Sequence, residues 1–156
     1  MKLDDNSFNF EKADDSSGFL LWQVTNLWQR EIKKALEKYG LTHSQFVLLA
    51  SIHWLILNKK DVTQILLSSY TKIDPMTTST VLRTLQTKGL LKRQEHSTDT
   101  RAKNVALTEN GQKIVKQAIK TVEDFDNSFF APLGYKTNAF NKNLISLLNQ
   151  IGKNGS

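Results

Sequence analysis

A short helix with an unusual outer face is predicted between Asp74 and Leu85, and this stretch constrains the fold more than any other. Asp74 is suited to cap the helix, because its carboxylate can accept a hydrogen bond from an unpaired backbone N–H group. Pro75 suits the first helical position, where its missing N–H is not needed. At about 100° per residue one side of the helix is apolar apart from one hydroxyl. This inward side comprises Thr78, Val81, Leu82 and Leu85.

The opposite side of this helix carries hydroxyl groups and one guanidinium group, but no carboxylate. A helix face exposed only to water usually mixes Glu with Lys. Hydroxyl groups and an Arg, by contrast, can form hydrogen bonds with base edges and phosphates. A threonine-rich solvated helix is the alternative that this stretch alone leaves open. The outward residues are Met76, Thr80, Arg83, Thr84 and Thr87.

A β-hairpin is predicted directly after this helix. Gly89 can take the left-handed backbone conformation that ends a helix. Residues 90–95 and 103–107 have the character of two short strands, and the polar stretch between them contains Asp99 and Arg101. A helix followed by a basic-tipped hairpin is typical of a winged helix-turn-helix. In that motif the helix enters the major groove, and the wing reaches an adjacent minor groove or the backbone.

Apolar residues at spacings of three and four predict further helices on both sides of this unit. The helix over residues 44–57 follows a capping box formed by Thr42 and Gln45, and it is apolar nearly all round. We therefore expect it at the centre of the core. The other expected helices cover residues 18–39, 64–70, 109–130 and 138–151, with residues 71–73 as the turn of the helix-turn-helix.

The predicted fold class is mainly α with a small β-hairpin wing, in one domain covering residues 1–156. Residues 1–17 are expected to form a flexible arm, and residues 41–107 the winged helix-turn-helix lobe. The end helices, within residues 18–39 and 109–152, carry wide apolar stripes that a monomer would leave exposed. A two-fold dimer would cover these stripes, so we expect a homodimer.

The net charge of +6 is concentrated in the middle of the chain. Between Lys59 and Lys103 there are nine Lys and Arg against four Asp and Glu, which leaves the rest of the chain a net charge of +1. A basic middle between nearly neutral ends favours nucleic acid as a partner. A membrane surface is disfavoured, because no basic amphipathic helix coincides with this segment. The chain has no cysteine, no signal peptide and no membrane-spanning run, so we expect a cytoplasmic protein.

The sequence contains no motif typical of catalysis or of cofactor binding. It has no glycine-rich phosphate loop, no nucleophile elbow and no paired carboxylates in an apolar setting. The three histidines are His43, His53 and His96, and their positions do not match a metal-binding spacing. We therefore predict neither an enzyme nor a metal site.

Several short motifs occur together in the order and spacing of a known family. They are Leu41-Thr42-x-x-Gln45 with Val47-Leu48; Thr63, Leu67, Ile73 and Asp74; Leu85, Lys88-Gly89-Leu90 and Arg93; Asp99-x-Arg101-Ala102; and Val105-x-Leu107-Thr108-x-x-Gly111. Across about residues 18–151 the chain resembles the multiple antibiotic resistance regulator (MarR) family of bacterial winged helix-turn-helix transcription factors.

The resemblance implies a dimeric repressor that binds a pseudo-palindromic operator in double-stranded DNA. By analogy Arg101 enters the minor groove, whose narrow A·T-rich form attracts Arg, and Asp99 orients it. The alternative for this pair is a surface ion pair worth at most about 1 kcal/mol. Thr80 replaces an Arg that the family often has, so base readout is expected to differ. The predicted DNA-binding residues are Lys72, Pro75, Met76, Thr77, Ser79, Thr80, Arg83, Thr84, Lys92, Arg93, Asp99, Arg101 and Lys103.

The resemblance also implies a small aromatic effector, held between the dimerisation helices and the DNA-binding lobe. The alternative is that the aromatic residues concerned belong to the core or to the dimer interface. A second functional hypothesis is a winged-helix module for protein–protein interaction without DNA readout, which would need a large apolar anchor such as Met76. The candidate effector-pocket residues are Trp22, Trp28, Trp54 and Phe125.

Overall fold

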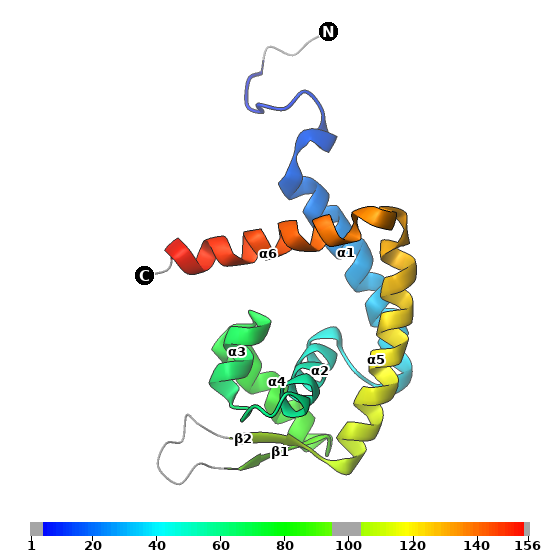
Figure 1. The fold of residues 1–156 in the computed structure, drawn as a ribbon, viewed down its shortest axis with the longest axis vertical. Helices are drawn as coiled ribbons and strands as arrows, with labels where there is room; N and C mark the ends of the chain where they lie inside the picture. Colours follow the sequence, from blue (N-terminus) through cyan, green and yellow to red (C-terminus); the bar gives the residue numbers. More distant parts are fainter. Residues whose placement is uncertain (1–4, 95–103, 155–156) are drawn as a thin grey trace.

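The computed structural model describes residues 5–94 and 104–154, with side chains to residue 150. Figure 1 shows a lobe of short helices and a hairpin, a long helix α5 beside it, and a terminal helix α6 that projects away from α5. This mainly helical fold with one small antiparallel sheet confirms the predicted fold class. The elements are η1 (Ala13–Asp15), α1 (Ser17–Leu36), η2 (Glu37–Tyr39), α2 (His43–Leu57), α3 (Gln64–Thr71), α4 (Pro75–Thr87), β1 (Leu91–Gln94), β2 (Asn104–Leu107), α5 (Glu109–Phe130), η3 (Ala131–Lys136) and α6 (Thr137–Asn154).

Helix α2 lies at the centre of the lobe, as predicted, and contacts α1, α3, α4, α5 and β2. It begins with the expected capping box. The hydroxyl of Thr42 accepts the backbone N–H of Gln45, and the side-chain oxygen of Gln45 accepts the backbone N–H of Thr42. Its C-terminal end differs from expectation, because Trp54 is 57% exposed and Leu57 is also exposed. Its buried side chains are Gln45, Phe46, Leu48, Leu49, Ile52 and Leu55.

The turn between α3 and α4 is held by side-chain hydrogen bonds to the backbone. The hydroxyl of Ser68 donates to the carbonyl of Ile73 at 2.7 Å, and that of Thr71 donates to the carbonyl of Leu67 at 2.8 Å. Lys72 has a left-handed backbone conformation, with φ of 63°. Thr71 thus stabilises the turn through its side-chain hydroxyl.

The hairpin packs its inward side chains under α4 and α2. β1 and β2 pair antiparallel, with Leu91 opposite Leu107 and Arg93 opposite Val105. Leu90 stays outside β1, because its backbone N–H donates to the carbonyl of Leu85 at the end of α4. That bond, with Gly89 at φ of 75°, is the helix ending that the sequence predicted. The start of β1 is thereby tied to the C-terminal end of α4.

Helices α1 and α5 run together at the edge of the lobe, joined by a hydrogen bond of 2.8 Å from the indole N–H of Trp28 to Asp126. Gly134 breaks the helical path within η3, and α6 then leaves α5 at an angle (Figure 1). Every residue from Asn141 to Gln150 is exposed. The apolar stripe of α6 therefore lies uncovered in the single chain.

In residues 5–94 and 104–154, no single helix combines the length and apolarity that crossing a membrane requires. The segments Ser17–Tyr39 and His43–Leu57 meet that requirement only when taken together, although they are bent by 74° relative to each other. The second of these segments is α2, the core helix of the lobe.

Candidate nucleic-acid interface

Helix α4 has the two faces that its sequence predicted. Thr78, Leu82 and Leu85 are fully buried against the lobe. On the opposite face Met76 is 80% exposed, and Arg83 is exposed beside it. The remaining outward residues Thr80, Thr84 and Thr87 are also exposed.

The N-terminal end of α4 is capped by Asp74, as predicted. One carboxylate oxygen accepts the backbone N–H of Thr77 at 2.8 Å, and the other accepts its hydroxyl at 2.6 Å. These hydrogen bonds lower the pKa of Asp74, so its carboxylate is charged at neutral pH. The helix itself carries no carboxylate on its outward face, and the negative charge of Asp74 lies at its N-cap.

The hydroxyls of the outward threonines are turned back to the helix backbone. Thr80 donates to the carbonyl of Met76 at 3.1 Å, Thr84 to that of Thr80 at 3.2 Å, and Thr87 to that of Arg83 at 3.0 Å. This is the back-bonding that Ser and Thr adopt within helices. Each of these hydroxyls has thus already used its only proton inside the protein.

The side chain of Arg93 on β1 reaches across to α4. Its guanidinium donates to the carbonyl of Ser79 at 2.9 Å, and the side chain is half-buried. Burial lowers the pKa of Arg93, and the positive charge of Arg83 lowers it further. Among the described residues its Nε is buried without a hydrogen-bond partner. Arg93, which the sequence assigned to a phosphate, therefore also braces the wing against α4.

Two of the predicted phosphate-binding lysines lie at the edges of this surface. Lys72 is exposed in the turn before α4, and its ammonium donates to the carbonyl of Ser69 at 3.0 Å. Lys92 is exposed on β1. The predicted wing-tip residues Asp99, Arg101 and Lys103 lie outside the described residues, as does His96.

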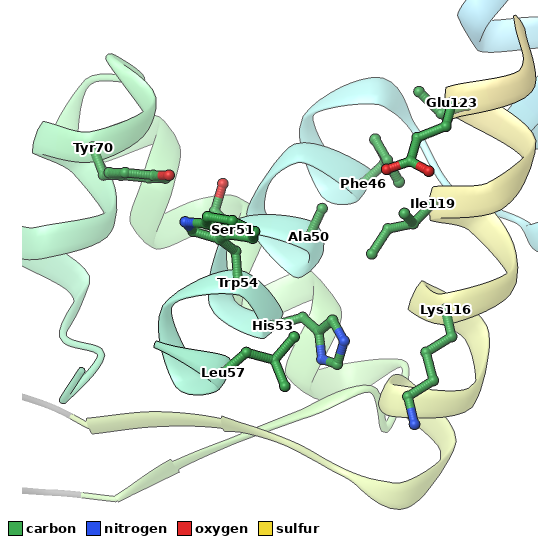
Figure 2. Close-up of a pocket in the computed structure, with 11 residues that line it drawn as sticks. Phe46, Ala50, Ser51, His53, Trp54, Leu57, Tyr70, Lys116, Ile119 and Glu123 are labelled. Atoms are coloured by element: carbon green, nitrogen blue, oxygen red, sulfur yellow. The ribbon is translucent and has the colours of Figure 1, made fainter. Parts of the chain in front are cut away.

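A pocket of about 500 Å³ opens between α2, α3 and α5. Figure 2 shows Trp54 and Tyr70 at one side of it, and the side chains of His53 and Lys116 nearer α5. Of the four aromatic residues predicted to line an effector cleft, Trp54 contributes to this pocket. Its lining comprises Phe46, Ala50, Ser51, His53, Trp54, Leu57, Tyr70, Lys116, Ile119, Val122 and Glu123.

The other three predicted pocket aromatics lie elsewhere. Trp28 bonds Asp126 and meets the ring of His43 edge-on at 5.1 Å between centroids. Phe125 packs against Phe129, with ring centroids 5.7 Å apart. Trp22 is 68% exposed on α1. In the single chain, therefore, the structure does not bring these residues together with Trp54.

The two described histidines lie on different parts of α2. His43 is half-buried at its start, where burial lowers its pKa and the charge of Asp126 opposes the shift. His53 lines the pocket further along the helix. Across the described parts of the chain, no three His, Cys, Asp or Glu side chains come together as a metal site would require.

Comparison with known proteins identifies the family. Residues 37–125 match the model described as ArnR1-like, winged-helix domain. The chain is also 43% identical over 129 residues to the uncharacterised HTH-type transcriptional regulator YdcH of Bacillus subtilis strain 168, covering 83% of this chain and 88% of that protein. The chain belongs to the winged helix-turn-helix family of transcriptional regulators.

Solved structures give this regulator the fold of the MarR type. The MepR–DNA complex of S. aureus has a TM-score of 0.78 at 21% identity, covering 90% of this chain and 99% of that chain. A mutant MarR from E. coli, complexed with operator DNA, has a TM-score of 0.71 at 24% identity, covering 84% of this chain and 91% of that chain. These structures confirm the fold that the resemblance to the MarR family implied.

Sequence reasoning did not find several residues of the regulator that the structure brings to these sites. Tyr70 was not placed in a pocket, because the packing of α3 against α2 is not readable from either helix alone. Lys116, Ile119 and Glu123 recur on α5 at spacings of three and four. That periodicity could have assigned them to one face, but it could not have shown that the face lines a pocket.

Proposed function

We propose that this regulator binds an operator in double-stranded DNA as a two-fold dimer and represses transcription. The proposal rests chiefly on α4, which exposes hydroxyls, methyl groups and Arg83 on a face without carboxylates. That face is presented beside the basic strand β1. MepR and MarR, whose fold this chain shares, have been crystallised with DNA. We place the regulator in the bacterial cytoplasm, where such DNA is found, and propose that it catalyses no reaction.

We assign roles in DNA binding by position on this surface. The first turns of a recognition helix approach base edges, and residues at its flanks approach the backbone. Pro75 and Met76 lie at the start of α4 near the bases. The residues proposed to read or approach bases are Thr77, Ser79, Thr80 and Arg83. Those proposed for the phosphates are Lys72, Thr84, Lys92, Arg93 and Lys103, with Asp99 and Arg101 for the minor groove.

A dimer would cover the apolar surface that the single chain leaves open. Leu20, Trp22 and Leu27 are exposed on α1, and Leu144 and Leu148 on α6. Exposure on this scale marks an interaction surface in a soluble protein. We propose that residues 18–39 and 109–152 supply the dimer interface and residues 41–107 the DNA-binding lobe. Two copies of α4 would then meet successive major grooves.

Selection from a library of random duplexes tests this proposal. The retained duplexes should share a pseudo-palindrome, and their affinity should fall steeply with salt concentration. Arg83→Gln should then weaken binding to the selected duplex by about tenfold or more, which corresponds to losing one good base contact. Lys12→Gln, which removes one positive charge from an exposed site before α1, should leave binding nearly unchanged.

Two results would contradict the proposal. If no duplex is retained at low salt concentration, the winged helix serves another partner. The alternative of a protein–protein interaction module, with exposed Met76 as its anchor, would then be favoured. If Arg83→Gln and Lys12→Gln weaken binding equally, the regulator binds DNA, but not through the outward face of α4.

We also propose that a small aromatic effector binds the pocket between α2, α3 and α5. The pocket of about 500 Å³ is large enough for such a ligand, and Phe46, Trp54 and Tyr70 offer aromatic surfaces. It lies between the lobe that carries α4 and the long helix α5, so a bound ligand could change their separation. Ligand screening by Trp fluorescence should give hits that Trp54→Phe weakens and Trp22→Phe does not.

A further inference from the structure

The threonines at the start of α4 present an unusual chemistry to a base edge. The hydroxyl of Thr77 donates to Asp74 at 2.6 Å, and that of Thr80 donates to the carbonyl of Met76 at 3.1 Å. A hydroxyl has one proton to donate. Both side chains are exposed, yet neither has a free donor.

What these side chains offer outwards is a γ-methyl group and the lone pairs of the oxygen. Met76, which is 80% exposed in the first turn of the same helix, adds a further apolar and polarisable group. Arg83 supplies the strong donors of this face, with its guanidinium exposed one turn further along. The first two turns of the helix therefore form a surface that is mostly methyl groups and acceptors.

The four bases differ in how well they suit such a surface. In the major groove thymine presents a methyl group, whereas guanine presents two acceptors that require a donor. Adenine and cytosine present amino donors that a threonine lone pair can accept. Guanine opposite Thr77 or Thr80 would have to compete for a proton that the protein already uses.

We infer that Thr77 and Thr80 determine specificity through their methyl groups, by contact with thymine methyls, and that guanine is read only opposite Arg83. This inference rests on the proposed function and adds to it the chemistry by which the operator is recognised. Operator positions in contact with the γ-methyl groups of Thr77 and Thr80 should therefore be A·T pairs, with the thymine facing these side chains. A G·C pair is expected where the guanidinium reaches.

Two near-isosteric substitutions separate the methyl group of Thr80 from its hydroxyl. Thr80→Val keeps the methyl and the β-branched shape but removes the hydroxyl, whereas Thr80→Ser keeps the hydroxyl and removes the methyl. Thr80 is exposed, so both variants should fold, and circular dichroism can confirm this. On a duplex selected with the wild-type protein, Thr80→Val should bind within about twofold of wild type. Thr80→Ser should bind more weakly by about fourfold for each half-site, because each subunit of the dimer loses one buried methyl contact.

A change in the DNA gives the matching control. Replacing each thymine of the duplex in turn by deoxyuridine removes only the thymine methyl group. At the thymine that contacts Thr80 in a half-site, the wild-type protein should lose about fourfold in affinity. Thr80→Ser should be insensitive to deoxyuridine at that position. The same pair of variants at Thr77 should identify a second, different thymine.

The results distinguish this inference from the proposed function. If the wild-type protein binds the selected duplex but deoxyuridine substitution changes nothing, the methyl contact is absent and the inference fails alone. It also fails if Thr80→Val loses more affinity than Thr80→Ser, because the hydroxyl would then carry the readout. If the wild-type protein binds no duplex, the proposed function fails and the inference with it.

Discussion

The ammonium nitrogen of Lys88 lies 2.6 Å from the carbonyl oxygen of Gly40 and 3.1 Å from the side-chain oxygen of Gln45. Lys88 directly follows α4, Gly40 caps the C-terminal end of η2, and Gln45 belongs to the capping box of α2. One positive charge thus joins three helices. Its position at the C-terminal end of η2 is also favourable, because helix C-termini carry partial negative charge.

Removing this junction should weaken operator binding without removing a phosphate contact. We expect Lys88→Met to lower affinity severalfold, because α4 is held less firmly relative to α1, while the dependence of affinity on salt concentration stays the same. Lys92→Met is the matched control, and it should flatten the salt dependence by about one phosphate contact. Titrations at several salt concentrations measure both. Equal flattening in the two variants would make Lys88 a DNA ligand instead.

The hydrogen bond between Arg93 and Ser79 should contribute measurably to stability. Arg93→Met keeps much of the aliphatic packing but loses the bond, so we expect the free energy of unfolding to fall by about 1 kcal/mol. Lys92→Met changes the neighbouring exposed residue of the same strand and should alter stability by no more than about 0.5 kcal/mol. Urea denaturation of both variants provides the comparison. Equal stabilities would show that the wing is not braced through Arg93.

Gly111 should not tolerate even one added carbon atom. A Cβ atom there would lie 1.9 Å from the carbonyl oxygen of Leu90, and the strand that begins at Leu91 leaves that backbone little room to move. We expect Gly111→Ala to cost about 3 kcal/mol or more, because the clash is with backbone rather than with a side chain. Gly18→Ala is the control, since nothing lies within 4 Å of its Cβ position. It should be neutral or slightly stabilising, and a similar cost at both sites would contradict the packing described.

The cluster of His43, Trp28 and Asp126 should make stability depend on pH. Burial lowers the pKa of His43, partly opposed by the charge of Asp126. Between its ordinary value near 6.5 and the lowered pKa, the unfolded chain therefore binds a proton that the folded chain does not. The contribution of His43 is complete above about pH 6.5, and stability should fall as the pH drops below that value.

Urea denaturation of His43→Gln provides the measurement for this cluster. The loss of stability between about pH 7.5 and about pH 5.5 should be smaller in the variant than in the wild-type protein. An identical loss in both would mean that other groups cause it.

The parts of the fold set by neighbouring residues could be predicted from the sequence. The caps at Asp74 and Thr42 depend on contacts within three residues, and the structure contains both of them. The burial of α4 followed from its helical period. Gly89 ended the helix as expected, because the left-handed conformation is a local property.

The parts that depend on distant contacts could not be predicted. Arg93 bonds a carbonyl fourteen positions away, and no periodicity marks a backbone acceptor. Trp28 meets Asp126, ninety-eight positions along the chain. From its aromatic character alone, Trp28 was predicted to line a ligand cleft. In the structure its indole N–H donates to the carboxylate of Asp126 on α5. The lining of the pocket could not be predicted for the same reason. Trp54 and Tyr70 come together only when α2, α3 and α5 pack against one another.

The exposed length of α6 has a consequence for the cell. Its main contacts within the chain are with η3, and residues 141–150 lie open to water. Since a short isolated helix is only marginally stable, its order should increase with the amount of protein synthesised. The link is mass action, because a second copy of the chain that covers the apolar stripe of α6 would stabilise the helix, and it would do so more completely at higher protein concentration.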